Sequence, residues 1–389
     1  MRLLRRTPAL LVANSLSAAI QGQFMFVAPW IVLARGGSPS DAALVAGLVF
    51  VPMLAAAVPA GVVCDRTEPA RLMVLSLSIG LGACALYPLC ALAGHDWLWL
   101  VLLAALVTGT VRLFVEGAVL REVGDTATAP WLLRRQTIRS TLNQAALFAS
   151  PFTGLLAFRA GGATAVLGLV CAIHVVAIAL AAHAGRTPSG RATRSRTSLV
   201  AGIASFLANP RLQRLGLAAL VWNVFAGAAL GIMPAVLREH ARLDELEASA
   251  AFVVGGVAVV ALTLPVVGAL QRIVGAPAAF LLAVAVEGVA VLGFADVRLA
   301  LLAPLLYAVF LLSNSAAAAA LSGARALEVD VDHQALLNLA LISVSLVGYL
   351  VGVAATAGLI GLIGFGAVLA LIAAGLGLTA VGFRRPLLA

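Results

Sequence analysis

The stretch Gly61-Val62-Val63-Cys64-Asp65-Arg66-Thr67-Glu68-Pro69-Ala70-Arg71 is a short charged turn between two long apolar runs, at 42–63 and 72–93. Each run holds about 20 residues, which is the length that an α-helix needs to cross the hydrocarbon core of a bilayer. Gly61 allows close helix approach, and the charged residues hold the turn at the membrane interface. The stretch therefore predicts two membrane-spanning helices joined by a tight polar turn.

The same pattern continues along all 389 residues. Hydrophobic residues make up 62% of the chain and charged residues only 11%, against about 25% charged in soluble proteins. This composition excludes a water-soluble fold and leaves no room for a sizeable soluble domain. We expect an all-α membrane protein with twelve transmembrane helices, at 9–34, 42–63, 72–93, 97–121, 137–158, 163–184, 213–236, 248–270, 276–295, 299–321, 335–358 and 362–383.

The cations of this chain are all arginine, and they give a net charge of +9. Nineteen fall in segments on the side of the N-terminus, five on the other side, and Arg112 lies inside a predicted span. By the positive-inside rule both termini are expected in the cytoplasm. Membrane topology thus accounts for the charge, and nucleic-acid binding is not expected. The apolar run after Arg6 is too long for a signal peptide, so we interpret it as an uncleaved first span.

The longest polar stretch, 185–212, divides the predicted spans into two sets of six. Its second part, 198–209, carries apolar residues at helical spacing, which predicts an amphipathic helix on the membrane surface. The predicted organisation is a six-helix half at 1–184, a cytoplasmic linker at 185–212 and a second six-helix half at 213–389.

The turn at 61–71 resembles the signature loop of the major facilitator superfamily, roughly Gly-x-x-x-Asp-Arg/Lys-x-Gly-Arg-Arg. Gly61, Asp65, Arg66 and Arg71 match it, whereas Glu68-Pro69 stands where a glycine and a basic residue are usual. Arg112 with Glu116 is similar to the family's membrane-embedded arginine motif. Ser150-Pro151-Phe152-Thr153-Gly154 is similar to its antiporter signature, and the stretch before span seven resembles its small-molecule and siderophore exporters.

This resemblance implies two pseudo-symmetric six-helix halves, with spans 1, 4, 7 and 10 lining a central cavity that opens alternately to each side. It implies that Asp65 faces the start of span eleven, near 334–337, and so closes the cytoplasmic side. Arg66 or Arg71 would meet an acid on span four, with Glu122 as the first candidate and Glu116 as the second. The implied location is a bacterial cytoplasmic (inner) membrane.

Ionisable side chains inside a bilayer cost several kcal/mol, so each one is a functional hypothesis. Arg112 and Glu116 lie four residues apart on one helical face, as a possible ion pair or a coupling site. Glu287 lies near the centre of span nine among apolar neighbours, as a carboxyl that changes protonation or as a structural group bonded to an adjacent span. In the family that the chain resembles, span nine lies at the periphery, away from the cavity. His174 at the centre of span six is also a buried ionisable group in a peripheral span.

Polar and aromatic residues at mid-depth of the cavity-lining spans are the candidate substrate contacts, and about half of them are expected to be packing residues. They are Gln21, Gln23, Thr108, Trp222, Asn223, Phe225, Phe310, Ser313 and Asn314. Asn143, Gln144 and Asn338 are expected to serve helix packing. A cavity with few charges, amides and aromatic rings favours an amphipathic or hydrophobic organic compound over a sugar or an inorganic ion.

These observations predict a secondary active transporter, most simply a proton-coupled efflux antiporter for a drug, siderophore or secreted metabolite. A lipid or lysophospholipid flippase of the same fold is the alternative. An enzyme is not expected, since the chain has no nucleophile–base or metal-ligand cluster, and without lysine there is no phosphate-binding loop for ATP. We expect no cofactor and no metal, with the proton gradient as energy source. The expected partners are the bilayer and a small-molecule substrate, and the protein is expected to be a monomer.

Overall fold

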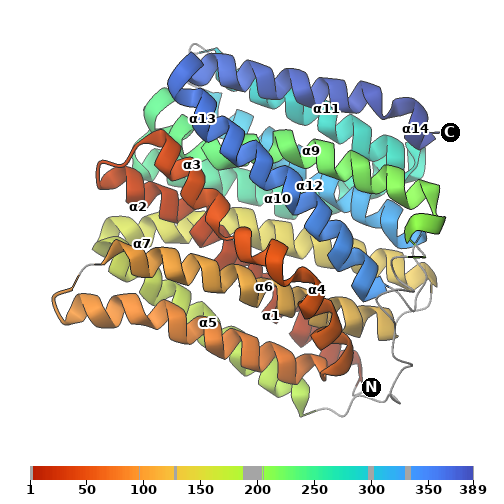
Figure 1. The fold of residues 1–389 in the computed structure, drawn as a ribbon, viewed down its shortest axis with the longest axis horizontal. Helices are drawn as coiled ribbons and strands as arrows, with labels where there is room; N and C mark the ends of the chain where they lie inside the picture. The colour runs from red at the N-terminus through yellow and green to blue at the C-terminus, as the bar shows by residue number, and fades with distance from the viewer. Residues whose placement is uncertain are drawn as a thin grey trace.

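A computed structural model describes residues 3–95, 97–126, 129–186, 204, 206–296, 302–328 and 334–388. The chain forms a bundle of long helices in which both termini lie at one end, called here the terminal end (Figure 1). The first half contains α1 (Leu3–Gly22), the π-helix η1 (Gln23–Val27), α2 (Ala28–Ala34), α3 (Pro39–Leu48), α4 (Val51–Arg66), α5 (Pro69–Leu92), α6 (Leu98–Thr126) and α7 (Ala129–Gly185). The second half contains α9 (Pro210–Ala235), the π-helix η2 (Val236–His240), α10 (Glu245–Val274), α11 (Ala276–Ala295), α12 (Ala303–Glu328), α13 (Gln334–Gly382) and α14 (Arg384–Leu388).

Two of these helices, α7 and α13, are hairpins with two arms each, as the reversal of each ribbon shows (Figure 1). The backbone leaves helical geometry at Gly161 and Gly162 in α7, with φ of 61° at Gly162, and at Gly364 in α13, with φ of 76°. Glycine adopts a positive φ without steric cost, so it can turn the chain at these points. Ten helices among the described residues are long and apolar enough to cross a membrane, with each hairpin counted once. The count of twelve crossings therefore stays a prediction.

Several helix ends follow directly from the sequence. Ser38 and Asp41 form a capping box at the start of α3, and Asp244 and Glu247 form another at the start of α10. Each box satisfies backbone N–H groups that the first helical turn leaves without partners. The helix α11 occupies 276–295, the range predicted from its apolar run.

The predicted single span at 42–63 is wrong in detail. It is broken at Val49 and Phe50 into α3 and α4. Pro52 stands at the start of α4 and has no N–H to continue the ladder of α3. The break brings Phe50 to the inner wall of the bundle, where its ring lies 4.2 Å from that of Tyr349 between centroids.

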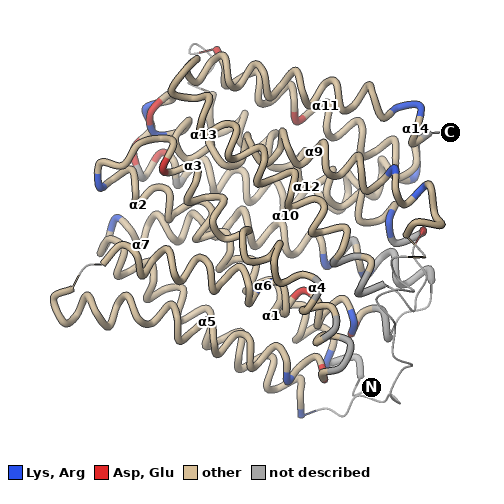
Figure 2. Tube along the Cα trace, viewed as in Figure 1, with Lys and Arg blue, Asp and Glu red and all other residues tan. Residues whose placement is uncertain are grey.

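The outer surface of the bundle is apolar along its middle, and charged residues gather at its two ends (Figure 2). Large apolar side chains that are more than half exposed recur around it on helices from both halves, as in Leu75, Leu89, Leu92, Val289, Leu292, Leu378 and Val381. Such a surface is stable only against lipid. The chain is therefore a multi-pass membrane protein.

Glycines allow the helices of the second half to approach closely. Gly348 and Gly352 on α13 face the backbone of α9, so that a Cβ at Gly352 would collide with the carbonyl oxygen of Val224. Small residues at such contacts are typical of helix packing in membranes.

Candidate functional site

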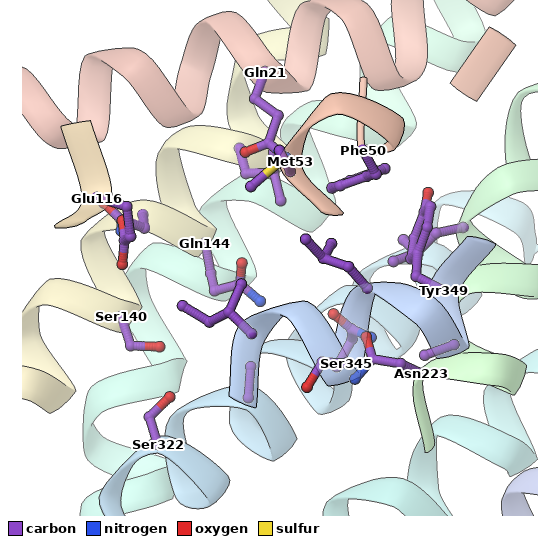
Figure 3. Close-up of a pocket in the computed structure, with 18 of the residues that line it drawn as sticks. Gln21, Phe50, Met53, Glu116, Ser140, Gln144, Asn223, Ser322, Ser345 and Tyr349 are labelled. Carbon is purple, nitrogen blue, oxygen red and sulfur yellow. The ribbon is translucent and has the colours of Figure 1, made fainter. Parts of the chain in front are cut away.

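A cavity of about 270 Å³ lies between the two halves. Its walls come from α1, η1, α6 and α7 of the first half, from Phe50 and from Met53 of α4, and from α9, α12 and α13 of the second half (Figure 3). One part of the wall is apolar, formed by Met25, Phe50, Met53, Leu113, Phe148, Leu230, Leu346 and Tyr349. Polar and charged side chains also line it, among them Arg112, Glu116, Arg139, Ser140, Ser322, Arg325 and Ser345.

The halves are packed together at the end opposite the termini. Leu33 and Ala42 of the first half form one apolar cluster with Ala235 of the second half. The guanidinium carbon of Arg238 lies 5.4 Å from the ring centroid of Trp30, and its Nη1 donates to the Trp30 carbonyl at 3.5 Å. Ser40 Oγ donates to the Ala357 carbonyl at 2.8 Å. These contacts cover the cavity floor, where Gln21, Met25 and Leu230 lie at mid-depth of their helices.

The apolar clusters near the terminal end stay within single halves. One contains Leu10, Met73 and Val119, all of the first half. Another contains Leu212, Leu337 and Leu341, all of the second half. Among the described residues, neither cluster joins the two halves. The lining residues of α12, from Asn314 to Arg325, run from mid-depth towards this end. The cavity thus reaches from the middle of the bundle towards the terminal end.

A buried polar network forms part of the wall that the first half contributes. Arg112 Nη2 lies 2.6 Å from Glu116 Oε2, and Arg112 Nη1 donates to Asn14 Oδ1 at 2.6 Å. Arg139 of α7 makes a second ion pair with Glu116. Asn143 Nδ2 donates to Glu116 Oε2 at 3.1 Å, and Asn143 Oδ1 accepts from Asn14 Nδ2 at 3.0 Å. The Glu116 carboxylate is therefore shared by two buried guanidinium groups. Asn143 also donates to it, and Asn14 bonds to both Asn143 and Arg112.

A second network links Glu287 of α11 to the cavity wall. Trp222 Nε1 donates to Glu287 Oε2, and Asn314 Nδ2 donates to Glu287 Oε1, each at 2.8 Å. Both donors line the cavity, whereas Glu287 itself lies behind them and is fully buried. A change in the charge of Glu287 would therefore act directly on two side chains that line the cavity.

The expectation that Arg112 is the one buried cation is wrong. Arg6, Arg139 and Arg325, which the sequence assigned to cytoplasmic segments, are 2%, 7% and 7% exposed. Arg6 pairs with Glu68 and with Glu122, the latter at 3.3 Å between Nε and Oε1. Arg139 and Arg325 line the cavity. Their position along the sequence, close to predicted span ends, gave no signal of which way their long side chains turn.

Four of the nine predicted substrate contacts line the cavity: Gln21, Trp222, Asn223 and Asn314. The other five pack elsewhere. Gln23 donates to the Ser150 carbonyl at 2.7 Å, Ser313 bonds to its own helix, and Thr108 lies against Cys84. The Phe225 ring lies against Gly375, and Phe310 packs beside Tyr307.

Two residues that were assigned to packing line the cavity instead. Asn143 and Gln144 both lie on its wall, and Gln144 points inward in Figure 3. The first arm of α7 was not among the spans expected to contribute, which is why the assignment failed. His174 bonds to its own helix, with 3.0 Å from Nδ1 to the Val170 carbonyl, and lies against Gly80 of α5.

The charged turn at 61–71 lies at the terminal end. Gly61 is buried in α4, while the side chains of Asp65 and Arg66 lie outside the described residues, as do those at 334–336 and of Asn338. Arg71 is exposed and forms no ion pair with a carboxylate in the described part of the chain, so the predicted pairing of Arg66 or Arg71 with Glu122 or Glu116 stays a prediction for Arg66. Glu68 caps α5 by accepting from the Arg71 N–H at 2.7 Å, with Pro69 in the first turn. This use as a helix start accounts for the departure from the family pattern.

Of the predicted surface helix at 198–209, residues 198–203 and 205 lie outside the described residues, while 204 and 206–208 are helical. Within the described part of the chain, no group of three or more His, Cys, Asp or Glu side chains is placed to hold a metal ion.

The chain is similar to known membrane transport proteins in sequence and in fold. The multidrug efflux pump Tap of Mycobacterium tuberculosis (strain ATCC 25618 / H37Rv) is 28% identical over 245 residues, which cover 60% of this chain and 55% of Tap. The chain thus spans about half the length of the curated relatives that it matches.

Two solved structures share the fold along nearly the whole chain. The human organic anion transporter MFSD10 (TETRAN) superposes with a TM-score of 0.74 at 15% identity, covering 97% of this chain and 99% of that one. The POT family transporter PepTSo gives 0.73 at 12% identity, covering 98% and 97%. The family model of the Major Facilitator Superfamily matches residues 10–356. With two helical halves around one cavity and a family match over most of its length, this chain belongs to the Major Facilitator Superfamily of transporters.

Proposed function

We propose that this chain exports a small amphipathic organic compound across a bacterial cytoplasmic membrane in exchange for protons. The observation that carries the proposal is the cavity of about 270 Å³ between the halves, whose lining combines large apolar side chains with buried polar and charged groups. A compound with an apolar body and a polar head matches such a site, because each of its parts meets a wall of the same polarity. The relationship to a multidrug efflux pump supports export, although the match covers only part of that protein.

The distribution of charge supports an orientation in the membrane. Arginines on the side of the termini outnumber those on the other side by 19 to 5, which favours termini in the cytoplasm. The cavity reaches towards this same end, so a substrate would enter it from the cytoplasm or the inner leaflet. Transport then requires the contacts around Trp30 and Arg238 to separate while the terminal end closes.

Proton exchange needs a carboxyl group whose charge is sensed by the substrate site. Glu287 meets this requirement through Trp222 and Asn314, which hold its two oxygens and also line the cavity. We assign the coupling proton to Glu287. Glu116 is committed to two arginines, and we assign it and Arg112 to the structure and charge of the wall rather than to proton release.

Export by intact cells tests the proposal. The chain would be produced in an efflux-deficient bacterium, and cellular retention of dansylglycine and dansylcadaverine would be followed with and without an uncoupler. We expect reduced retention of at least one probe, loss of this effect with the uncoupler, and its loss in Glu287→Gln. Glu239→Gln, an exposed acid of η2, is the matched control that keeps export. Energy-dependent export that persists in Glu287→Gln would contradict the assignment of the proton site.

A further inference from the structure

The cavity carries more positive than negative charge. Its wall includes three arginines, Arg112, Arg139 and Arg325, against one carboxylate, Glu116, a formal charge of +2. Guanidinium groups stay protonated in proteins. Glu116 already pairs with Arg112 and Arg139. The excess charge is therefore not balanced by any carboxylate among the described residues of the wall.

Among the three arginines of the cavity wall, Arg325 of α12 is the one that lacks a charged partner in the described part of the chain. It is 7% exposed, and its Nη2 donates to Ser345 Oγ at 3.3 Å. Its Nε has no hydrogen-bond partner, and no carboxylate of the described chain lies within ion-pair distance. A buried guanidinium without a counter-charge costs several kcal/mol. An arginine whose only task was topology would extend to the membrane surface from its position three residues before the end of α12.

The two positive groups face the cavity from opposite halves. Arg139 belongs to α7 of the first half and Arg325 to α12 of the second. Ser140 of α7 and Ser322 of α12 also line the cavity (Figure 3). Hydroxyl and guanidinium groups are hydrogen-bond donors for an oxyanion, and arginine binds carboxylate, sulfonate and phosphate groups with paired N–H bonds.

We infer that the substrate of this cavity is an amphipathic anion, whose oxyanion head lies between Arg325 and the Arg112–Arg139 pair and whose apolar body lies along Phe50, Met53 and Phe148. The inference rests on the proposed transport function and adds the charge of the substrate to it. Like charges on the two walls repel and so favour the separated halves when the cavity is empty. An anion attracts both walls, which gives it a higher affinity for a closed terminal end than for an open one, as a transported substrate requires.

Binding of two matched probes tests the inference. Dansylglycine is an amphipathic carboxylate, and dansylcadaverine carries the same fluorophore on an amine. Binding to the full chain in lipid nanodiscs would be read from energy transfer to the dansyl group from tryptophan, since Trp222 lines the cavity. We expect dansylglycine to bind at least about tenfold more tightly than dansylcadaverine, as one additional charged hydrogen bond provides.

Variants locate the preference. Arg325→Gln should weaken dansylglycine binding about tenfold or more and leave dansylcadaverine binding unchanged or stronger. Arg325→Lys should retain most of the preference, which separates loss of charge from loss of fold. Arg272→Gln removes an exposed arginine of α10 that bonds only to its own helix, and should change neither probe. Equal affinities for the two probes, or a preference that survives Arg325→Gln, would overturn the inference.

Competition identifies the source of the anion. Displacement of dansylglycine by naphthalene-2-sulfonate favours a free organic acid, and displacement by lysophosphatidylglycerol favours a lipid. Displacement by neither overturns an anion site in the cavity. The experiments distinguish failure of the charge preference from failure of proton exchange. Dansylglycine bound through Arg325 but moved without protons refutes the antiport, whereas proton-driven export of dansylcadaverine alone refutes the anion site.

Discussion

Because Glu116 is shared by two arginines, the effect of Arg139→Gln on stability should change sign when Glu116 is also replaced. Glu116 pairs with Arg112 and with Arg139, and all three side chains are less than about one-tenth exposed. Glu116→Gln leaves two buried like charges without a counter-ion. Removing one partner of a buried ion pair costs about 3–5 kcal/mol. Arg139→Gln alone leaves Glu116 paired with Arg112 and bonded to Asn143, so it loses only charged hydrogen bonds, about 1.5–3 kcal/mol.

In the Glu116→Gln background the effect of Arg139→Gln changes sign. There Arg139 is an unpaired buried charge, and its replacement removes a repulsion from Arg112. We expect the double variant to be more stable than Glu116→Gln by about 1–3 kcal/mol, and less stable than the wild type. The contacts of Glu116 in one wall of the cavity are the basis of this expectation.

Thermal unfolding with a thiol-reactive fluorophore measures this cycle in the native chain. Cys64 and Cys84 carry no disulfide and are fully buried, so they react when the first half unfolds. The expected order of midpoints is wild type, Arg139→Gln, the double variant and then Glu116→Gln. If Arg139→Gln lowers the midpoint in both backgrounds, the two arginines do not share Glu116 and the account of this wall is refuted.

Three further predictions follow from other contacts. Gly352→Val places side-chain atoms against the Val224 carbonyl of α9 and should sharply reduce the folded yield in size-exclusion chromatography. The control Gly358→Val places its side chain in open space and should keep the yield, and equal yields of the two variants would contradict the close packing of α9 and α13. Arg238→Ala removes the contact with Trp30 at the closed end, so labelling of Leu230→Cys by a membrane-impermeant maleimide from outside the cell should rise severalfold, and unchanged labelling would show that this contact does not hold the end closed. Trp222→Phe removes one of the two hydrogen-bond donors to Glu287 and should weaken proton coupling more than Phe280→Leu, which changes the ring packed against Trp222. The ratio of protons to substrate transported in vesicles measures the coupling, and equal effects of the two variants would show that the Trp222 hydrogen bond has no part in it.

Local sequence patterns predicted the positions of several helices and turns but not the break at Val49 and Phe50 or the direction of long side chains. Apolar runs and turn residues predicted α11 to the residue, and predicted the turn of α7 at 159–162, because burial in lipid and glycine geometry act over a few residues. The pairing of Arg112 with Glu116 was also foreseeable, since the spacing of four places both on one helical face.

The rest of the site depends on contacts between distant segments. Arg139 and Arg325 lie near the ends of their spans, where an arginine usually extends to the headgroups, and only the packing of α7 and α12 turns them inward. The hydrogen bonds of Glu287 to Trp222 and Asn314 join residues 65 and 27 positions apart. No periodicity in one sequence contains that information. The expected cavity with little charge was therefore too apolar.

Exchange of protons for substrate in purified vesicles tests the central claim most directly. The chain would be reconstituted into proteoliposomes that contain a pH-sensitive dye and are loaded with dansylglycine, and a proton gradient would be imposed from outside. We predict that dansylglycine leaves as protons enter, that both fluxes stop in Glu287→Gln, and that both persist in Glu239→Gln. Release of dansylglycine with no proton entry, at the same rate with and without the gradient, would contradict proton-coupled export.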